Sequence, residues 1–180
     1  MKYFGTDGFR GEANQDLTLY HAIKIGRFLG YYFNKEKNGN GKIVIGKDTR
    51  RSSYMFEDAL SAGITSSGSD AYLLHVTTTP SVSYVVRSED FDCGVMITAS
   101  HNPYHDNGIK IINSDGEKMD DEFLQKLEDY IDADIKDIDL KPIHIIQKLK
   151  PDFVLSFNYT RTYEKIYGDV IIQHIHGVVA

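Results

Sequence analysis

Apolar residues along this chain follow two patterns, one typical of strands and one typical of helices. Short apolar runs bounded by glycine or polar residues predict buried strands. These runs cover residues 43–46, 71–74, 95–97 and 109–112. Stretches with apolar residues at helical spacing, or preceded by a capping residue, predict helices. These stretches cover residues 19–34, 54–67, 81–87 and about 120–131.

The order of these elements predicts the fold class. Strands and helices alternate, which is typical of an α/β protein with a layered mixed sheet and helices on both faces. The runs 95–97 and 109–112 are joined by a loop without a helix, so we expect them to pair antiparallel. Thr18 is the expected N-cap of the first helix, and Ser52 or Ser53 of the second.

Small and polar residues follow the run 95–97, ending in the turn signal Asn102-Pro103. In open α/β sheets the ligand crevice lies outside the carboxyl ends of the strands. A hydroxyl there, that of Ser100, could carry a phosphoryl group held by backbone N–H groups and a nearby lysine. The alternative is a turn with no chemistry, because loop Ser and Asn residues mostly serve turns.

A serine hydrolase is a third hypothesis for the same loop. Neighbouring residues on an extended chain point to opposite sides, so His101 is not expected to act as a base toward Ser100. The Gly-x-Ser-x-Gly elbow is also absent from the sequence. Both observations argue against a hydrolase.

Two other segments carry candidate binding residues. Gly5, Gly8 and Gly11 predict a loop around Arg10, whose guanidinium could bind a phosphate or a sugar oxygen. The alternative is a glycine-rich turn with a solvated arginine. After the run 43–46, Asp48 and Arg50 are expected to form a structural ion pair that supports neighbouring loops.

Composition narrows the class of protein. Hydrophobic residues make up 41% of the 180 residues, enough to bury a core. Cys93 is the only cysteine, which excludes an internal disulfide and favours a cytoplasmic location. No apolar run approaches the length of a membrane span, and no cluster of Lys and Arg suggests nucleic acid. Residues 120–139 hold nine acids against two lysines, which favours a solvated helix face and linker over a metal site.

The loop sequence resembles a known family. Thr98-Ala99-Ser100-His101-Asn102-Pro103, followed by Asn107-Gly108-Ile109-Lys110, resembles the phosphoserine loop of the α-D-phosphohexomutases. Within that family the opening segment, residues 2–11, is most similar to the phosphoglucosamine mutases. The resemblance covers residues 2–132 and implies the first domain of a four-domain enzyme. Our predicted boundaries are 1–140 for this domain and 141–180 for a tail of different origin, as from a fusion or a truncated fragment.

The resemblance also implies residue roles. Such a mutase moves a phosphoryl group between the 1- and 6-positions of a hexose or hexosamine phosphate through phosphorylated Ser100. Lys110 would be a general acid or base, Arg10 would neutralise charge, and His101 would orient the loop. The further residues implied are Thr6, Gly8 and Asn102 as substrate- or phosphate-binding, with Asp48 and Arg50 as support.

The resemblance implies Mg²⁺ as well, bound between the phosphate of Ser100 and a carboxylate loop. That loop, Asp-x-Asp-x-Asp-Arg, does not occur in this sequence. The family's sugar-recognition and C-terminal phosphate-binding loops are also missing. We therefore expect little mutase activity from this chain alone, and the choice among glucosamine, glucose and mannose phosphates stays open.

Residues 151–180 resemble a different group, the bacteriophage abortive-infection family, through Phe-Asn-Tyr-Thr at 157–160 and Ile-His-Gly at 175–177. Strands are predicted at 153–157 and 171–175. His174 and His176 would share a strand face, compatible with metal or phosphate binding or with two solvated histidines. A second hypothesis is therefore a non-catalytic fusion scaffold with a phage-defence or partner-binding tail.

Overall fold

The structure is a computed structural model that describes residues 1–36, 39, 41–133, 153–156 and 171–174, the last two ranges as backbone. The chain divides into two compact units, Met1–Ile135 and Lys136–Ala180. In the second unit, β7 (Phe153–Ser156) and β8 (Ile171–His174) pair in parallel. Both strands were predicted one residue longer. The tail motifs at 157–160 and 175–177, His176 and the side chain of His174 lie outside the described residues, so the tail resemblance stays a prediction.

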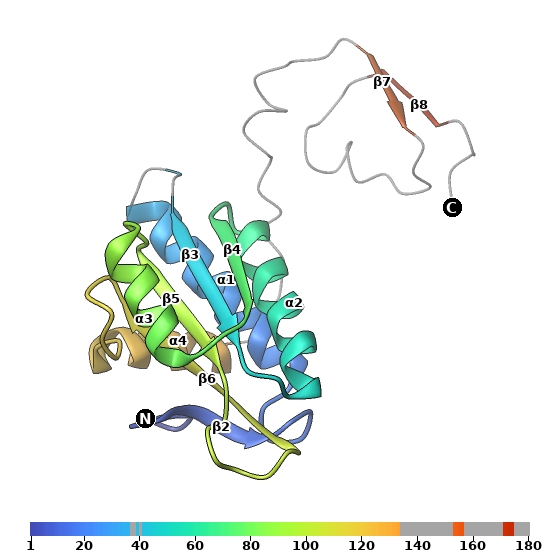
Figure 1. The fold of residues 1–180 in the computed structure, drawn as a ribbon. Helices are drawn as coiled ribbons and strands as arrows, with labels where there is room; N and C mark the ends of the chain where they lie inside the picture. Colours follow the sequence, from blue (N-terminus) through green and yellow to red (C-terminus); the bar gives the residue numbers. More distant parts are fainter. Residues whose placement is uncertain (37–38, 40, 134–152, 157–170, 175–180) are drawn as a thin grey trace. The chain divides into compact units, whose positions relative to one another are not determined.

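The first unit is built on a six-stranded mixed sheet in the order β1-β2-β6-β5-β3-β4 (Figure 1). Its strands are β1 (Phe4–Gly5), β2 (Gly8–Glu12), β3 (Lys42–Lys47), β4 (Asp70–Val76), β5 (Cys93–Ile97) and β6 (Asp106–Asn113). β3 runs parallel to β4 and β5, whereas the pairs β5–β6, β6–β2 and β2–β1 are antiparallel. The predicted antiparallel pairing of 95–97 with 109–112 is confirmed by the partners Val95–Ile111 and Ile97–Ile109.

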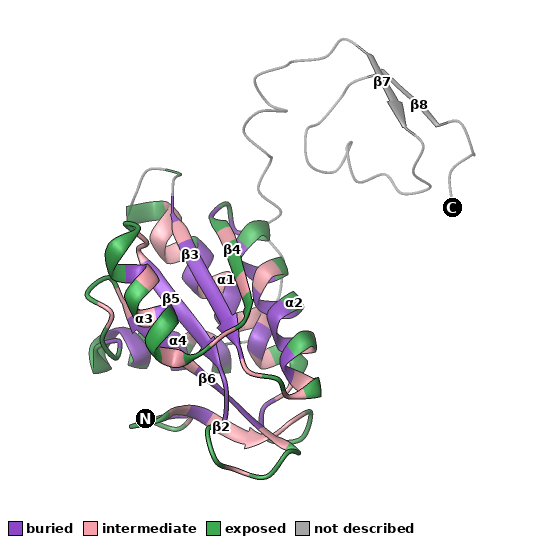
Figure 2. Cartoon of the chain, viewed as in Figure 1, coloured by how far each residue is buried: buried purple, intermediate pink, exposed green. Residues whose placement is uncertain are grey.

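Helices cover both faces of this sheet, as the element order predicts. They are α1 (Leu19–Glu36), α2 (Arg51–Ser66), α3 (Thr79–Ser88) and α4 (Asp121–Asp132). Alternate residues of a strand point to opposite faces. Ile43 and Ile45 of β3 accordingly pack in the core shared with α1, α2 and α4, and Val44 packs with Val82 of α3. The central strands are therefore buried on both sides (Figure 2). Within the described ranges, no helix has the length and apolar character needed to span a bilayer.

The helix caps differ from expectation at α2. Thr18 caps α1 as predicted, because its Oγ1 accepts the N–H of His21. The prediction of Ser52 or Ser53 as the cap of α2 is wrong: α2 begins at Arg51 and its N-cap is Arg50, without a side-chain capping bond. The two serine hydroxyls bind side chains in a polar network described below, and are not available to cap the helix.

The glycine-rich segment near the N-terminus is a hairpin, not the loop expected around Arg10. Gly5 pairs with Gly8, leaving only Thr6 and Asp7 as the turn, and Arg10 lies within β2 opposite Gly108 of β6. Gly8 has φ +92°, and a Cβ there would lie 2.5 Å from the carbonyl oxygen of Ile109. A residue without a side chain is therefore required where the turn closes over β6.

Glu128 of α4 binds the backbone of the N-terminal residues. Its carboxylate accepts the backbone N–H groups of Lys2, Tyr3 and Phe4 at 2.6–2.7 Å. Burial by itself would raise the pKa of Glu128, but the bonds from Phe4, Lys2 and Tyr3 outweigh it and lower the pKa below its ordinary value. Glu128 is buried, so the acidic run is not solvated throughout as expected.

Replacing Glu128 by Gln is expected to lower the free energy of unfolding by about 1.5–3 kcal/mol at neutral pH, because hydrogen bonds to a charged group are lost. The pKa is lower in the folded protein than in the unfolded chain, where it is about 4.3. The contribution is thus complete above that value and disappears as the pH falls through the folded-state pKa. Urea unfolding followed by circular dichroism should show the wild type and Glu128→Gln converging in acid.

The matched control is Glu122→Gln, at an exposed position of the same helix where the carboxylate pairs with Lys126. Its effect should stay below about 1 kcal/mol, as for other exposed ion pairs. A difference between wild type and Glu128→Gln that is independent of pH would contradict the role given to the charge.

Candidate functional site

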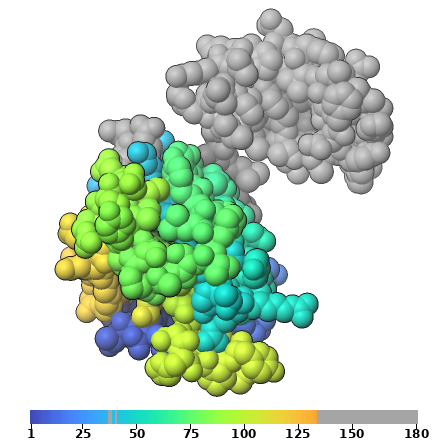
Figure 3. Space-filling model, in the orientation of Figure 1, coloured from blue at the N-terminus to red at the C-terminus, as the bar shows by residue number. Residues whose placement is uncertain are grey.

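Ser100 lies three residues beyond the end of β5, at the carboxyl ends of the parallel strands. Its side chain is exposed, and its backbone has φ +57°, a left-handed conformation that few residues other than glycine adopt. Its N–H donates to the Oγ1 of Thr98 at 3.0 Å. The loop that carries it stands out at the lower edge of the first unit, in yellow-green (Figure 3). The hydroxyl is thus presented to solvent by a backbone that is fixed locally.

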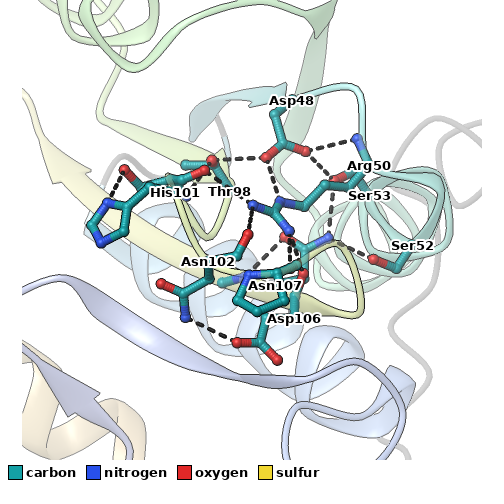
Figure 4. A network of polar contacts seen from close by, with 12 residues as sticks. Asp48, Arg50, Ser52, Ser53, Thr98, His101, Asn102, Asp106 and Asn107 are labelled. Carbon is teal, nitrogen blue, oxygen red and sulfur yellow. Dashed lines mark hydrogen bonds and ion pairs between the residues drawn. The ribbon is translucent and has the colours of Figure 1, made fainter.

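The side chain of Arg50 binds the backbone of this loop. Its guanidinium donates to the carbonyl oxygens of Ser100 at 3.0 Å, Asn102 at 2.8 Å and Asp106 at 3.1 Å, and also to that of Pro103 (Figure 4). The planar fork of an arginine can satisfy several acceptors at once. One side chain therefore determines the path of the chain from residue 100 to residue 106.

Asp48 orients Arg50. Its Oδ2 accepts from Arg50 Nε at 3.0 Å, so the predicted ion pair is present, and the carboxylate also accepts from the hydroxyls of Ser53 and Thr98 at 2.8 Å. Burial alone would raise the pKa of Asp48, but the bonds from the backbone of Arg50, from Ser53, from Thr98 and from the Arg50 side chain together lower it. Asp48 is therefore an ionised anchor that joins the ends of β3 and β5.

Asn107, at the start of β6, completes this network. Its buried amide nitrogen donates to the hydroxyls of Ser52 and Ser53 at 2.8 and 2.9 Å. Its Oδ1 accepts the N–H of Gly108 at 2.8 Å. Sequence reasoning assigned no role to this residue, although it belongs to the motif. The signal was present in its position, since an amide that starts an apolar strand is expected to have buried partners.

His101 lies closer to Ser100 than predicted. Its Nδ1 is 3.4 Å from the Oγ of Ser100, a long contact. The expectation that the two side chains point apart assumed an extended chain, and the left-handed backbone of Ser100 removes that assumption. Among the described residues His101 has no carboxylate partner to orient it, which a Ser-His-Asp triad requires.

A second group of candidates gathers on the neighbouring strands. The Nη1 of Arg10 is 3.6 Å from Oδ2 of Asp7, and the Nζ of Lys110 is 3.6 Å from Oδ1 of the same carboxylate. Asp7 was not among the predicted site residues. Thr6 is exposed in the same turn, and it lines a hollow of about 170 Å³ together with Gly8 and Lys110.

The two groups meet at Gly108. Its carbonyl accepts the N–H of Thr98 at 2.8 Å, and Arg10 is its partner on β2. A Cβ on Gly108 would lie 2.6 Å from the carbonyl oxygen of Thr98 and 2.9 Å from Cγ of Arg10. This glycine thus lets the arginine lie against the base of the Ser100 loop. Asn102 is half-buried in that loop, where its amide donates to Asp106.

The described residues offer few ligands for the metal ion that the family implies. Across the ranges that the structure describes, no group of three His, Cys, Asp or Glu side chains could hold one. Asp48 is engaged by Arg50, Ser53 and Thr98, so within the same ranges a phosphate on Ser100 is the ligand that the loop could offer. The residues present do not by themselves form a Mg²⁺ site, so no step is derived through the metal.

Comparison with known families decides the classification. The model of the phosphoglucomutase/phosphomannomutase α/β/α domain I matches residues 1–137. The chain belongs to this family. The predicted resemblance and the predicted fold class are both confirmed.

Named relatives point to one branch of the family. The phosphoglucosamine mutase of Lachnospira eligens is 67% identical over 138 residues, which cover 76% of this chain and 31% of that protein. The phosphoglucosamine mutase of Lachnoclostridium phytofermentans is 66% identical over 137 residues, covering 76% and 30%. This chain therefore spans about a third of the length of these curated relatives.

Solved structures agree on the fold. A candidate phosphomannomutase from Thermus thermophilus superposes with a TM-score of 0.64 at 31% identity, over 71% of this chain and 29% of the other. A phosphoglucomutase/phosphomannomutase family protein from Burkholderia thailandensis gives 0.61 at 25% identity, again over 71% and 29%. In both cases the matched part of the larger protein has the layered sheet described above.

Proposed function

We propose that residues 1–137 are the phosphoserine-bearing domain of a phosphoglucosamine mutase, with Ser100 as the phosphoryl carrier. The observation that carries this proposal is the exposed Ser100 hydroxyl at the end of β5, on a loop that Arg50 holds by its carbonyl oxygens. Phosphoryl transfer depends mainly on positioning and on neutralising charge. A fixed hydroxyl with Arg10 and Lys110 on the adjoining strands suits that task.

The proposed step conserves the phosphoryl group. The oxygen of Ser100 attacks a phosphorus of a hexosamine bisphosphate, a P–O bond to the serine forms, and the P–O bond to the sugar breaks. The serine hydroxyl gives up its proton, for which the Nδ1 of His101 is the near acceptor at 3.4 Å, and the sugar oxygen takes up a proton, for which Lys110 is the proposed donor. Arg10 would offset the negative charge on the phosphoryl oxygens.

The choice of substrate and the metal ion in this proposal rest on the relatives and on the sequence. The phosphoglucosamine mutases among the relatives favour a hexosamine phosphate over glucose or mannose phosphate. A Mg²⁺ ion would supply charge neutralisation at the phosphate when bound, with further ligands from outside the described residues. The cytoplasmic location, the boundary near residue 140 and the alternative of a non-catalytic scaffold with a partner-binding tail stay predictions.

The test is phosphorylation of Ser100 by glucosamine 1,6-bisphosphate with Mg²⁺. We expect the 180-residue chain to acquire one phosphate that peptide mapping places on Ser100. Ser100→Ala should acquire at least tenfold less, and Ser114→Ala, in an exposed turn, should behave as the wild type. Phosphate on other residues, or equal labelling of Ser100→Ala, would refute the carrier role. Sustained turnover of glucosamine phosphate by this chain would refute its predicted incompleteness.

A further inference from the structure

Arg10 and Lys110 form a pair of cations on one face of the sheet. Arg10 lies opposite Gly108 in the antiparallel ladder, and Lys110 is two residues further along β6, on the same face as Gly108. A Cβ on Gly8 would lie 2.9 Å from Cγ of Lys110, so this glycine adjoins the lysine side chain. Glycines at positions 8 and 108 therefore leave the two long cationic side chains without bulky neighbours.

One donor of this pair is left without a partner. The Nε of Arg10 is buried and makes no hydrogen bond within the described part of the chain. A buried donor without an acceptor destabilises the folded protein. The nearest anion, the carboxylate of Asp7, lies 3.6 Å from Nη1, beyond the 2.7–2.9 Å of a charge-assisted hydrogen bond. Asp7 attracts Arg10 without satisfying it.

The carboxylate of Asp7 forms an ion pair with each of the two cations. Its two carboxylate oxygens lie at 3.6 Å from Arg10 and from Lys110, and its side chain is 63% exposed, against 18% and 28% for the cations. It belongs to a two-residue turn, whose exposed side chains can change rotamer at little cost. A phosphate offers several acceptor oxygens on one atom and can accept from Nε and a terminal nitrogen of an arginine together.

We propose that Asp7 is an internal anion that occupies the Arg10–Lys110 pair in the absence of ligand, and that a phosphate group displaces it. Asp7 is thus a positioning residue: it holds the two cations together before binding and weakens phosphate binding by competing for them. This inference rests on the proposed function, which gives Arg10 and Lys110 to the phosphate of the substrate, and it adds the residue that sets their affinity.

The test is a titration of the folded chain with inorganic phosphate at constant ionic strength, followed by the backbone-amide NMR signals of Gly8 and Gly108, which adjoin the pair and are present in every variant. Asp7→Asn removes the charge and keeps the shape, so we expect phosphate to bind about three- to tenfold more tightly, as for the loss of one or two weak competing ion pairs. Asp7→Glu should restore binding to near the wild-type level. A purely structural role for Asp7 would predict weaker or unchanged binding.

The control is Asp58→Asn, which changes the net charge equally at an exposed position of α2 and should alter binding less than twofold. Arg10→Gln tests the underlying site and should reduce binding at least tenfold. If Asp7→Asn does not tighten binding while Arg10→Gln weakens it, the inference about Asp7 fails and the phosphate site stands. If Arg10→Gln has no effect, or neither wild type nor Asp7→Asn gives a saturable shift, the proposed phosphate site fails as well.

Discussion

Replacing Lys47 by Met is expected to lower the free energy of unfolding by about 3–5 kcal/mol, a large part of the 5–15 kcal/mol typical of a domain. Lys47 ends β3 and is 1% exposed; its Nζ lies 2.5 Å from Oε2 of Glu57, which is 3% exposed. The ammonium also lies 4.3 Å from the ring centre of Tyr54. Without Lys47 the buried carboxylate loses its counter-charge, and its Oε1 already has no partner within the described residues.

The double variant Lys47→Met with Glu57→Met separates this explanation from a packing defect. It removes both charges, and such replacements are often neutral or stabilising. We therefore expect the double variant to be more stable than Lys47→Met alone. The stabilities are measured by urea unfolding; the Nδ1 of His75, which also lies 3.3 Å from Oε2, is present in all the variants compared.

Lys126→Met is the matched control for this measurement. Lys126 is an exposed lysine whose ion pair with Glu122 is on the surface of α4. Its loss should cost less than about 1 kcal/mol. If Lys47→Met loses as little free energy of unfolding as Lys126→Met, or if the double variant is less stable than the single one, the stabilising role given to the buried Lys47–Glu57 pair is wrong.

Replacing Arg50 by Ala is expected to release the Ser100 loop. Four loop carbonyl groups and the carboxylate of Asp48 lose the hydrogen bonds that the guanidinium donates. We expect hydrogen exchange of the loop amides of Asn102 and Asp106 to accelerate at least tenfold, and phosphorylation of Ser100 to fall by a similar factor. The free energy of unfolding should fall by about 2–4 kcal/mol, as for a mostly buried charge pair with charge-assisted bonds.

Two further variants and one reference amide test whether the effect of Arg50→Ala is local to the Ser100 loop. Arg50→Lys keeps the charge beside Asp48 but lacks the planar fork, so it should recover part of the stability while exchange in the loop remains fast. Arg51→Ala, at the adjacent exposed position, should change neither. The amide of Gly116, hydrogen bonded in a separate turn, is the internal reference. Equal acceleration at Gly116 would indicate global opening and contradict a local role for Arg50.

The predicted sheet and helices agree with the structure because their signals are local. The runs at 43–46, 71–74, 95–97 and 109–112 all lie within strands, and the helical spacing located α1 and α2 to within a few residues. The hairpin at Gly5–Gly8 was missed because three glycines in seven residues suggest a loop. Its longer strand, β2, is stabilised because β6 provides a partner more than 90 residues away in sequence, and β1 pairs with β2.

The candidate site could be predicted from the sequence only in part. The motif around Ser100 was visible in the sequence, and so was the pairing of Asp48 with Arg50, two residues apart. The sharing of Asp7 between Arg10 and Lys110 was not, since Asp7 and Lys110 come together only through the pairing of β2 with β6. Lys47 carried a signal that was not used: a charged residue at the end of an apolar run must find a counter-charge if that run is buried.

By itself the sequence determined the family, the alternation of strands and helices, and the serine that lies beyond a strand. These follow from periodicity and motif, which depend on neighbours along the chain. The tertiary structure decided which carbonyl groups Arg50 holds, which cations share Asp7, and that Ser100 is left-handed and near His101. The first two depend on the order of strands in the sheet, because that order alone places residues 50 or more positions apart within a few ångströms of one another; the third depends on the path of the loop that Arg50 holds.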